Sequence, residues 1–141
     1  MNVVVDASVA LKWLIAEDDS ATALQIRAKH GILAPELLLI ECRNALLTRV
    51  RRQRIRRSEA EEAERALNAD RLGIDVVPSS ALLQHAFTLA LALHEPIYDC
   101  IYLAAALATE RILITARFAT CGKGFAITSS RKENRTHGQF G

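Results

Sequence analysis

The sequence of 141 residues has little of what several protein classes require. Aromatic residues make up only 5% of it, against 50% hydrophobic residues, which disfavours a β-sandwich and favours closely packed helices with small faces. It has no Gly-rich GxGxxG or P-loop sequence, which argues against a nucleotide-binding fold. No window approaches about 18 uninterrupted apolar residues, so we expect no membrane span.

Cysteine is also scarce. The three cysteines, Cys42, Cys100 and Cys121, have no CxxC or CxxH spacing, which indicates neither a disulfide framework nor a zinc site. Cys42 and Cys100 lie in apolar helical patterns, where cysteine behaves as a small hydrophobic residue. The opening residues lack the basic region and long apolar stretch of a secretory signal peptide. We therefore expect a soluble protein of the reducing cytoplasm, with no membrane association.

The charge excess is small and unevenly placed. The formal net charge is +2, from 18 basic and 16 acidic residues. Residues 129–141 supply all of this excess, through Arg131, Lys132 and Arg135 against Glu133. The remainder of the chain is neutral, so no global field draws it to nucleic acid or to a membrane.

Short β-branched runs alternate with helical periodicity along the chain. We predict strands at 3–5, 32–34, 74–77 and 112–115, with 125–127 as a candidate fifth. Helices are predicted at 7–15, 21–30, 35–54, 58–73, from the capping residues 78–80 to 94, and at 99–110. This alternation predicts an α/β fold with three layers, in which a mostly parallel central sheet of four to five strands is flanked by helices. The domain is predicted to span residues 1–128, and the polar residues 129–141 to form a flexible tail.

Three carboxylates occupy positions that are unusual for charged residues. Asp6 directly follows the first predicted strand, Glu41 lies inside the apolar run 37–47, and Asp99 directly precedes the apolar run 101–104. An unpaired carboxylate against a core is unfavourable, so such groups are usually neutralised, hydrogen-bonded or bound to a metal ion. Three such acids from three distant segments suggest one shared site.

Each acid also has a purely structural interpretation. Asp6 and Asp99 could each cap the helix that follows, since aspartate is favoured at helix N-termini. Glu41 could form an ion pair with Arg43, Arg49 or another basic residue at a helix rim. For each aspartate alone the two interpretations are balanced, whereas the apolar residues four positions on either side of Glu41 favour a site.

Clustered carboxylates without histidine or cysteine suit Mg²⁺ or Mn²⁺, which prefer oxygen ligands and keep several waters. Such ions can activate water and offset the charge of a scissile phosphate. The chemistry implied by Asp6, Glu41 and Asp99 is therefore the metal-assisted hydrolysis of a phosphodiester.

Four stretches, taken in their order and spacing, resemble the PIN domain family. They are VVVDASVAL around Asp6, PELLLIECRNAL around Glu41, YDCIYLAAA around Asp99 and ILITA around Thr115. Within that family they are most similar to the VapC toxins of bacterial VapBC toxin–antitoxin pairs. The resemblance covers about residues 1–128.

The resemblance implies an endoribonuclease that depends on Mg²⁺ or Mn²⁺. Asp6, Glu41 and Asp99 match the metal-site acids of the family, and Ser8 and Thr115 match small hydroxyl residues that line the same site. We expect Asp6 and Asp99 to hold the ion, and Glu41 to bind it through water or to orient the nucleophile. Family members cut structured RNA, often transfer RNA, are inhibited by a VapB antitoxin and are commonly homodimers, so we expect the same partners here.

The sequence departs from the family pattern at one position. A fourth acid usually follows the Thr-Ala of the last strand, but here Thr115-Ala116 runs directly into Arg117. The three remaining acids can hold one ion, and a second ion becomes doubtful. An alternative function is therefore a catalytically impaired PIN-fold protein that binds its antitoxin, RNA or both without turnover.

Six arginines form the main charge cluster of the chain: Arg49, Arg51, Arg52, Arg54, Arg56 and Arg57. As a functional patch they would track RNA phosphates or bind acidic residues of an antitoxin. As a structural feature they would be a solvated helix end, neutralised by the nearby Glu59, Glu61 and Glu62. The sequence leaves both interpretations open.

Overall fold

The computed structural model describes residues 2–115 of the chain. Within this range, one parallel sheet contains four strands: β1 (Asn2–Val5), β2 (Gly31–Pro35), β3 (Ile74–Val77) and β4 (Ile112–Ile114). Their order across the sheet is β3-β2-β1-β4. The predicted α/β class with a parallel central sheet is confirmed. The candidate fifth strand at 125–127 and the predicted tail at 129–141 lie outside the described residues.

β1 lies between β2 and β4 and pairs with both in parallel register. Its valines, at positions 3 to 5, are at most 1% exposed. Such complete burial is typical of a parallel strand covered by helices on both faces, and β-branched side chains pack well on a pleated surface. The strand that carries Asp6 at its end is therefore rigidly held.

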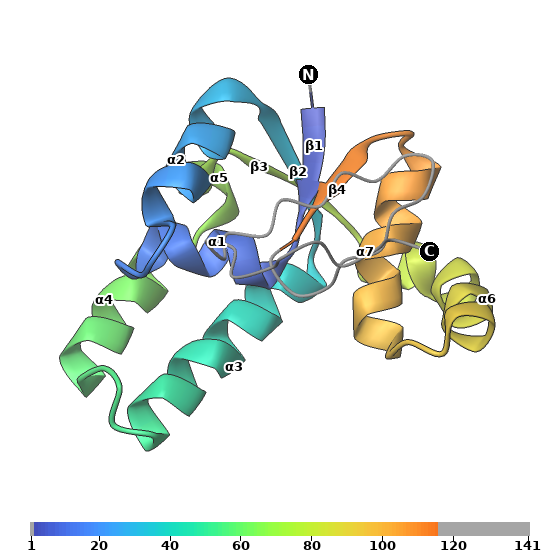
Figure 1. The fold of residues 1–141 in the computed structure, drawn as a ribbon. Coiled ribbons are helices and arrows are strands. Elements are labelled where there is room, and N and C mark those ends of the chain that lie inside the picture. The colour runs from blue at the N-terminus through green and yellow to red at the C-terminus, as the bar shows by residue number, and fades with distance from the viewer. Residues whose placement is uncertain (1, 116–141) are drawn as a thin grey trace, which may run out of the picture.

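Helices cover both faces of this sheet (Figure 1). On one side α7 (Ile97–Ala108) packs against β1, β2 and β4, and α6 (Leu83–Leu93) packs against α7. On the other side lie α1 (Ala7–Leu14), α2 (Ser20–Lys29) and α5 (Ala69–Leu72). Residues 99–106 of α7 are all buried. Among the described residues, no helix is long and apolar enough to cross a membrane.

Two further helices project from the sheet as a pair, α3 (Leu37–Arg51) and α4 (Arg57–Ala66) (Figure 1). The start of α3 contacts β2, whereas its later turns pack against α4. We call residues 43–66 the α3–α4 arm. The arm is held to α1 by a small apolar cluster, separate from the main core, whose buried members are Leu11, Leu46 and Ala63.

The helix predicted at 58–73 is in fact two helices, α4 and α5. Asn68 separates them, because its side-chain oxygen caps α5 by accepting from the backbone N–H groups of Asp70 and Arg71 at 3.0 and 3.2 Å. Gly73 then ends α5 with a φ of 67°, a left-handed conformation that glycine adopts without steric cost. Asparagine is among the preferred N-cap residues, so Asn68 was a readable signal for this boundary.

Both helix starts next to prolines were misplaced in the prediction. Pro35 ends β2 instead of opening a helix, and α3 begins at Leu37, whose backbone N–H donates to Ser79 Oγ at 3.0 Å. α7 begins at Ile97, directly after Pro96, two residues before the predicted start. The helix that ends at Leu93 is preceded by a 3₁₀ turn, η1 (Ser79–Leu82). The shift of α7 matters because it places Asp99 inside the first turn.

Candidate functional site

Asp6 and Thr115 meet at the carboxyl edge of the sheet. Val5 of β1 pairs with Ile114 of β4 in parallel register, so the next residue of each strand emerges at the same edge. The Thr115 hydroxyl donates a hydrogen bond to Asp6 Oδ2. The chain leaves β1 for β2 on one side and returns to β4 on the other, which makes this edge a topological switch point. Open α/β sheets bind ligands at such points.

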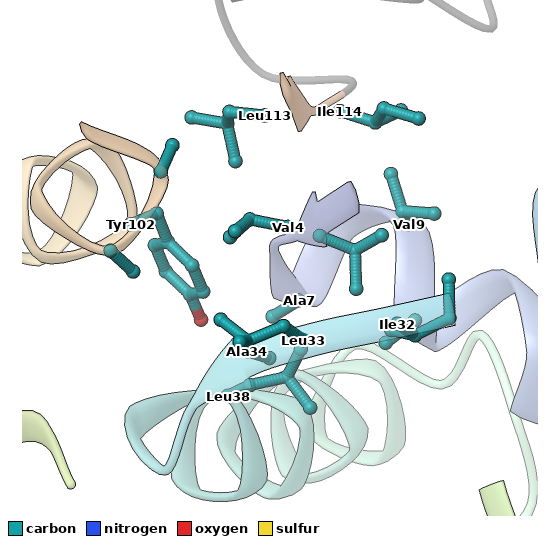
Figure 2. Packing of buried hydrophobic residues seen from close by; sticks show 14 of the residues in the cluster. Val4, Ala7, Val9, Ile32, Leu33, Ala34, Leu38, Tyr102, Leu113 and Ile114 are labelled. Carbon is teal, nitrogen blue, oxygen red and sulfur yellow. The ribbon is translucent and has the colours of Figure 1, made fainter. Parts of the chain in front are cut away.

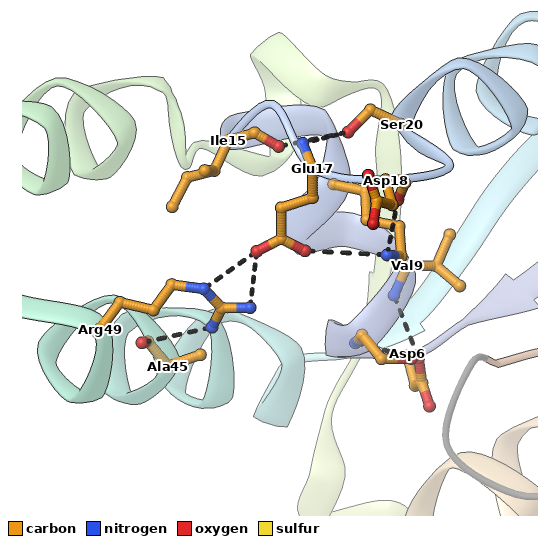
Figure 3. Close-up of polar contacts among 10 residues, drawn as sticks. Asp6, Val9, Ile15, Glu17, Asp18, Ser20, Ala45 and Arg49 are labelled. Carbon is orange, nitrogen blue, oxygen red and sulfur yellow. Dashed lines mark hydrogen bonds and ion pairs between the residues drawn. The ribbon is translucent and has the colours of Figure 1, made fainter. Parts of the chain in front are cut away.

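The other carboxylate oxygen of Asp6 caps α1. Asp6 Oδ1 accepts from the backbone N–H groups of Ser8 and Val9 at 3.0 and 3.3 Å, and from the Ser8 hydroxyl at 2.5 Å; Figure 3 draws the contact with Val9. Asp6 is only 2% exposed, and these bonds are what a buried carboxylate requires. The structural interpretation of Asp6 as a helix cap is confirmed, and Asp6, Ser8 and Thr115 form one hydrogen-bonded group.

Glu41, the fifth residue of α3, accepts a hydrogen bond from Tyr102 of α7. The distance from the Tyr102 hydroxyl oxygen to Glu41 Oε1 is 2.6 Å. Burial raises the pKa of the Tyr102 phenol, and the hydrogen bond to Glu41 and the negative charges of Glu41 and Asp6 raise that pKa further. The hydroxyl is therefore protonated at neutral pH and acts as a donor.

The arginines that could have compensated Glu41 form ion pairs elsewhere. Arg43 pairs with Glu64 of α4 at 2.9 Å. Arg49 pairs with Glu17, which precedes α2, at 2.7 Å (Figure 3). The hydrogen bond that Tyr102 donates to Glu41 comes from α7, a different helix from the one that carries Glu41.

Asp99 lies one turn before Tyr102 on α7 and is 7% exposed. The structural alternative in which Asp99 is an N-cap is wrong, since the residue at that position is Pro96. After burial, the charge of Asp99 is the largest cause that raises the pKa of Cys100. Residues three apart share a helix face, so Tyr102 stands on the face of Asp99 while it donates to Glu41. Tyr102 was not predicted to have a role at the site, although its spacing of three residues from Asp99 was the available signal.

Asp6 and Glu41 both act electrostatically on Tyr102 and Cys42. The negative charges of both raise the pKa of Tyr102, and both also raise the pKa of Cys42, which burial chiefly raises, to about 12. The charges of Asp6 and Glu41 thus act on the same two buried side chains. In Figure 2 the Tyr102 ring extends from α7 beside Val4, with its hydroxyl oxygen near the end of β2.

Comparison with protein-family models matches residues 3–117 to the PIN domain. The chain belongs to the PIN domain family. The match covers more than half of the 141 residues and includes β1, α3, α7 and β4. PIN domains are generally metal-dependent nucleases, so membership indicates a nuclease. No curated protein matches the chain.

The donor atoms of this PIN domain suit a hard divalent ion. Asp6, Glu41 and Asp99 offer carboxylate oxygens, and Ser8 and Thr115 offer hydroxyl oxygens. Within residues 2–115, no three His, Cys, Asp or Glu side chains are grouped closely enough to hold an ion by themselves. Mg²⁺ usually keeps several waters and takes one or two protein carboxylates, so it does not require a cage of three carboxylates.

The two described cysteines of the PIN domain are structural. Cys42 and Cys100 are free thiols with 0% exposure, which confirms that they pack as small hydrophobic residues. With its pKa raised to about 12, the Cys42 thiol is protonated at neutral pH and serves neither as a nucleophile nor as a thiolate ligand. Cys121 lies outside the described residues, as does the site of the missing fourth acid.

The arginine cluster divides into two groups. Three of its members form ion pairs, at 2.7, 3.2 and 2.8 Å: Arg49 with Glu17, Arg56 with Glu59 and Arg57 with Glu61. The exposed Arg51, Arg52 and Arg54 form no ion pair within residues 2–115. An open cleft of about 760 Å³ between α1 and the arm is lined in part by Lys12, Arg49, Arg52 and Arg54, with Glu17 and Asp18. Neutralisation by the nearby acids of α4 thus holds for Arg56 and Arg57, whereas Arg49 pairs with the distant Glu17.

Proposed function

We propose that this PIN domain is a toxin-type endoribonuclease that uses Mg²⁺ or Mn²⁺ to hydrolyse phosphodiester bonds of RNA. The observation that carries the proposal is the buried Asp6 at the topological switch point, held by Ser8 and Thr115 in a chain of a nucleolytic family. Transfer RNA or another structured RNA is the proposed substrate, and the cytoplasm the proposed location.

The acids of the site take different roles in this proposal. Asp6 and Asp99 hold the ion, and Glu41 binds it through water or orients the attacking water. The bound ion supplies activation of water and compensation of charge on the scissile phosphate. Asp6 is fixed by its hydrogen bonds to α1 and β4, so its carboxylate is oriented before an ion arrives.

A VapB-like antitoxin is the proposed inhibitor, supported by the resemblance of the four sequence stretches to VapC toxins. The positive charge around the cleft between α1 and the arm supports binding of RNA phosphates or of acidic antitoxin residues.

A homodimer is the proposed assembly. Its support is an apolar stripe on α6. This helix has no charged residue, and its Leu83, Phe87 and Leu91 are 48, 60 and 63% exposed. Light scattering on the wild type and on Phe87→Glu tests the dimer, and a dimer that persists in the variant would exclude α6 as its interface.

The activity is tested on a total transfer-RNA pool with antitoxin-free protein, in Mn²⁺, in Mg²⁺ and in EDTA. We expect cleavage with either metal, no cleavage in EDTA, and loss of cleavage in Asp99→Asn. Asp75→Asn is the matched control, because Asp75 is an exposed aspartate on β3, away from the switch point. Metal-dependent cleavage that survives in a folded Asp99→Asn protein would contradict the role given to Asp99.

The second candidate is a PIN-fold protein that binds antitoxin or RNA without turnover. The run Thr115-Ala116-Arg117, which lacks the usual fourth acid, favours it. A folded wild type that is silent, and that gains cleavage when an Asp is inserted between Ala116 and Arg117, would establish this candidate. Unchanged cleavage after the insertion would mean that the missing acid does not limit the enzyme.

A further inference from the structure

We propose that Tyr102 is a positioning residue whose hydroxyl holds the Glu41 carboxylate in the orientation in which it serves the metal site. This inference rests on the proposed function, because it assigns a role to a side chain that contacts one of the proposed site acids. Tyr102 acts through Glu41 and is not itself a ligand.

The contact between the two side chains is short and bridges two helices. The 2.6 Å between the Tyr102 hydroxyl and Glu41 Oε1 lies in the range of hydrogen bonds to charged acceptors, which are stronger than neutral ones. The two residues are 61 positions apart, on α7 and α3. Glutamate has a flexible side chain, and its conformational entropy opposes any single geometry. A contact of this kind fixes one of its carboxylate oxygens.

Packing alone does not account for the hydroxyl. The Tyr102 side chain is 1% exposed and its ring lies beside Val4 in the core (Figure 2), a position that phenylalanine would fill equally well. A buried tyrosine requires a partner for its hydroxyl. Here that partner is the carboxylate of a half-buried glutamate rather than a backbone carbonyl.

The position of Tyr102 also connects Glu41 to Asp99. Asp99 precedes Tyr102 by three residues on a helix whose residues 99–106 are all buried. One helix face therefore carries both Asp99, a proposed metal ligand, and Tyr102, which donates to Glu41. Removal of the hydroxyl takes away this contact to Glu41 and leaves Asp99 in place.

The test is a double-mutant cycle on Mn²⁺ affinity, measured by titration calorimetry on the full chain without antitoxin. The variants are Tyr102→Phe, Glu41→Gln and their combination. Tyr98→Phe is the control, because Tyr98 is the only other tyrosine and is 57% exposed. We expect Tyr102→Phe to weaken Mn²⁺ binding about tenfold, as loss of a residue that orients a ligand typically does. Tyr98→Phe should change it less than about twofold, and so should Tyr102→Phe in the Glu41→Gln background.

A second variant avoids the core. Glu41→Asp keeps the charge but shortens the side chain by one methylene, so the carboxylate no longer reaches the hydroxyl. It should weaken Mn²⁺ binding about as much as Tyr102→Phe, about tenfold. Unchanged affinity in both Glu41→Asp and Tyr102→Phe would overturn the inference.

Urea unfolding of the same variants in EDTA separates positioning from structure. Coupling between Tyr102 and Glu41 in both stability and Mn²⁺ affinity supports the proposal. Coupling in stability alone, or a Tyr102→Phe effect that persists undiminished in Glu41→Gln, shows a structural hydrogen bond only and overturns it. If the wild type binds no Mn²⁺ and Asp99→Asn behaves in the same way, the proposed function is overturned. The positioning role of Tyr102 is then overturned as well.

Discussion

The carboxyl edge of the sheet and the α3–α4 arm are both rich in charged residues, but they hold them in opposite ways. At the edge, Asp6 is 2% exposed and is hydrogen-bonded by residues from α1 and from the end of β4. In the arm, the ion pair between Arg57 and Glu61 leaves those side chains 87 and 53% exposed. The edge surrounds its buried carboxylate with hydrogen-bond donors, whereas the arm leaves its charged groups exposed to solvent.

This difference determines what each region can contribute. Exposed ion pairs are worth about 0–1 kcal/mol and are screened by salt, so the arm can exchange its partners at little cost. A buried donor or acceptor left without a partner costs about 1–3 kcal/mol, so the edge keeps its geometry. The arm is suited to binding charged molecules, and the edge is suited to chemistry.

The largest expected effect is at Asp6. Asp6→Ala removes the cap of α1 and the acceptor of Thr115, and we expect it to lower the free energy of unfolding by about 2–4 kcal/mol. Asp6→Asn keeps an oxygen for the cap and an amide opposite Thr115, so it should lose less than about half as much. Urea unfolding in EDTA measures both variants. Equal losses would mean that the charge, not the hydrogen bonds, stabilises this edge.

High pH should lower the free energy of unfolding through the buried thiol of Cys42, which lies next to Glu41 in the sequence. The pKa of Cys42 rises from 9.0 to about 12, chiefly through burial, so the unfolded chain loses this proton at lower pH than the folded one. The stability due to this difference is complete below pH 9 and is lost as the pH rises towards 12, by about 1.4 kcal/mol per pH unit.

Cys42→Ala tests this, because it should reduce the slope of unfolding free energy against pH by about that amount between roughly pH 10 and 11. Asn44→Ala, an exposed change two residues along α3, is the control and should leave the slope unaltered. Equal slopes in wild type and Cys42→Ala would show that Cys42 does not carry the effect.

The smallest effect is expected in the arm. A double-mutant cycle with Arg57→Ala and Glu61→Ala should give a coupling of about 0.3–0.5 kcal/mol that shrinks as salt is added. The pair of Arg49 with Glu17, whose side chains are only 27 and 26% exposed, should give a larger value, near about 1 kcal/mol. Similar coupling in the two pairs would show that burial does not set the strength of the ion pairs made by the arm.

Local signals were enough to predict much of the fold. The Val3–Val5 run indicated a buried strand, and alternating strand and helix patterns indicated a parallel sheet with Asp6 and Thr115 at its carboxyl edge. Proline was less informative, because it can end a strand, as Pro35 does, or stand just before a helix, as Pro96 does. These choices depend on tertiary contacts such as that between Leu37 and Ser79.

The site was predictable only in part. Asp6, Glu41 and Asp99 could be selected because each is a charge in apolar surroundings. The Tyr102–Glu41 contact could not be predicted, because it joins residues 61 positions apart on two different helices, α7 and α3. Nor does the sequence show which arginines find acidic partners, since Glu17 reaches Arg49 from a loop far away in the chain.

The pairing of β4 with β1 has a consequence for synthesis of the protein. β4 follows every other described element in the chain, yet it pairs with the first strand and places Thr115 on Asp6, 109 positions away. A nascent polypeptide that has emerged only as far as α7 can pair β1, β2 and β3, but it lacks one wall of the site. The ribosome therefore releases almost the whole described domain before the candidate nuclease centre can close.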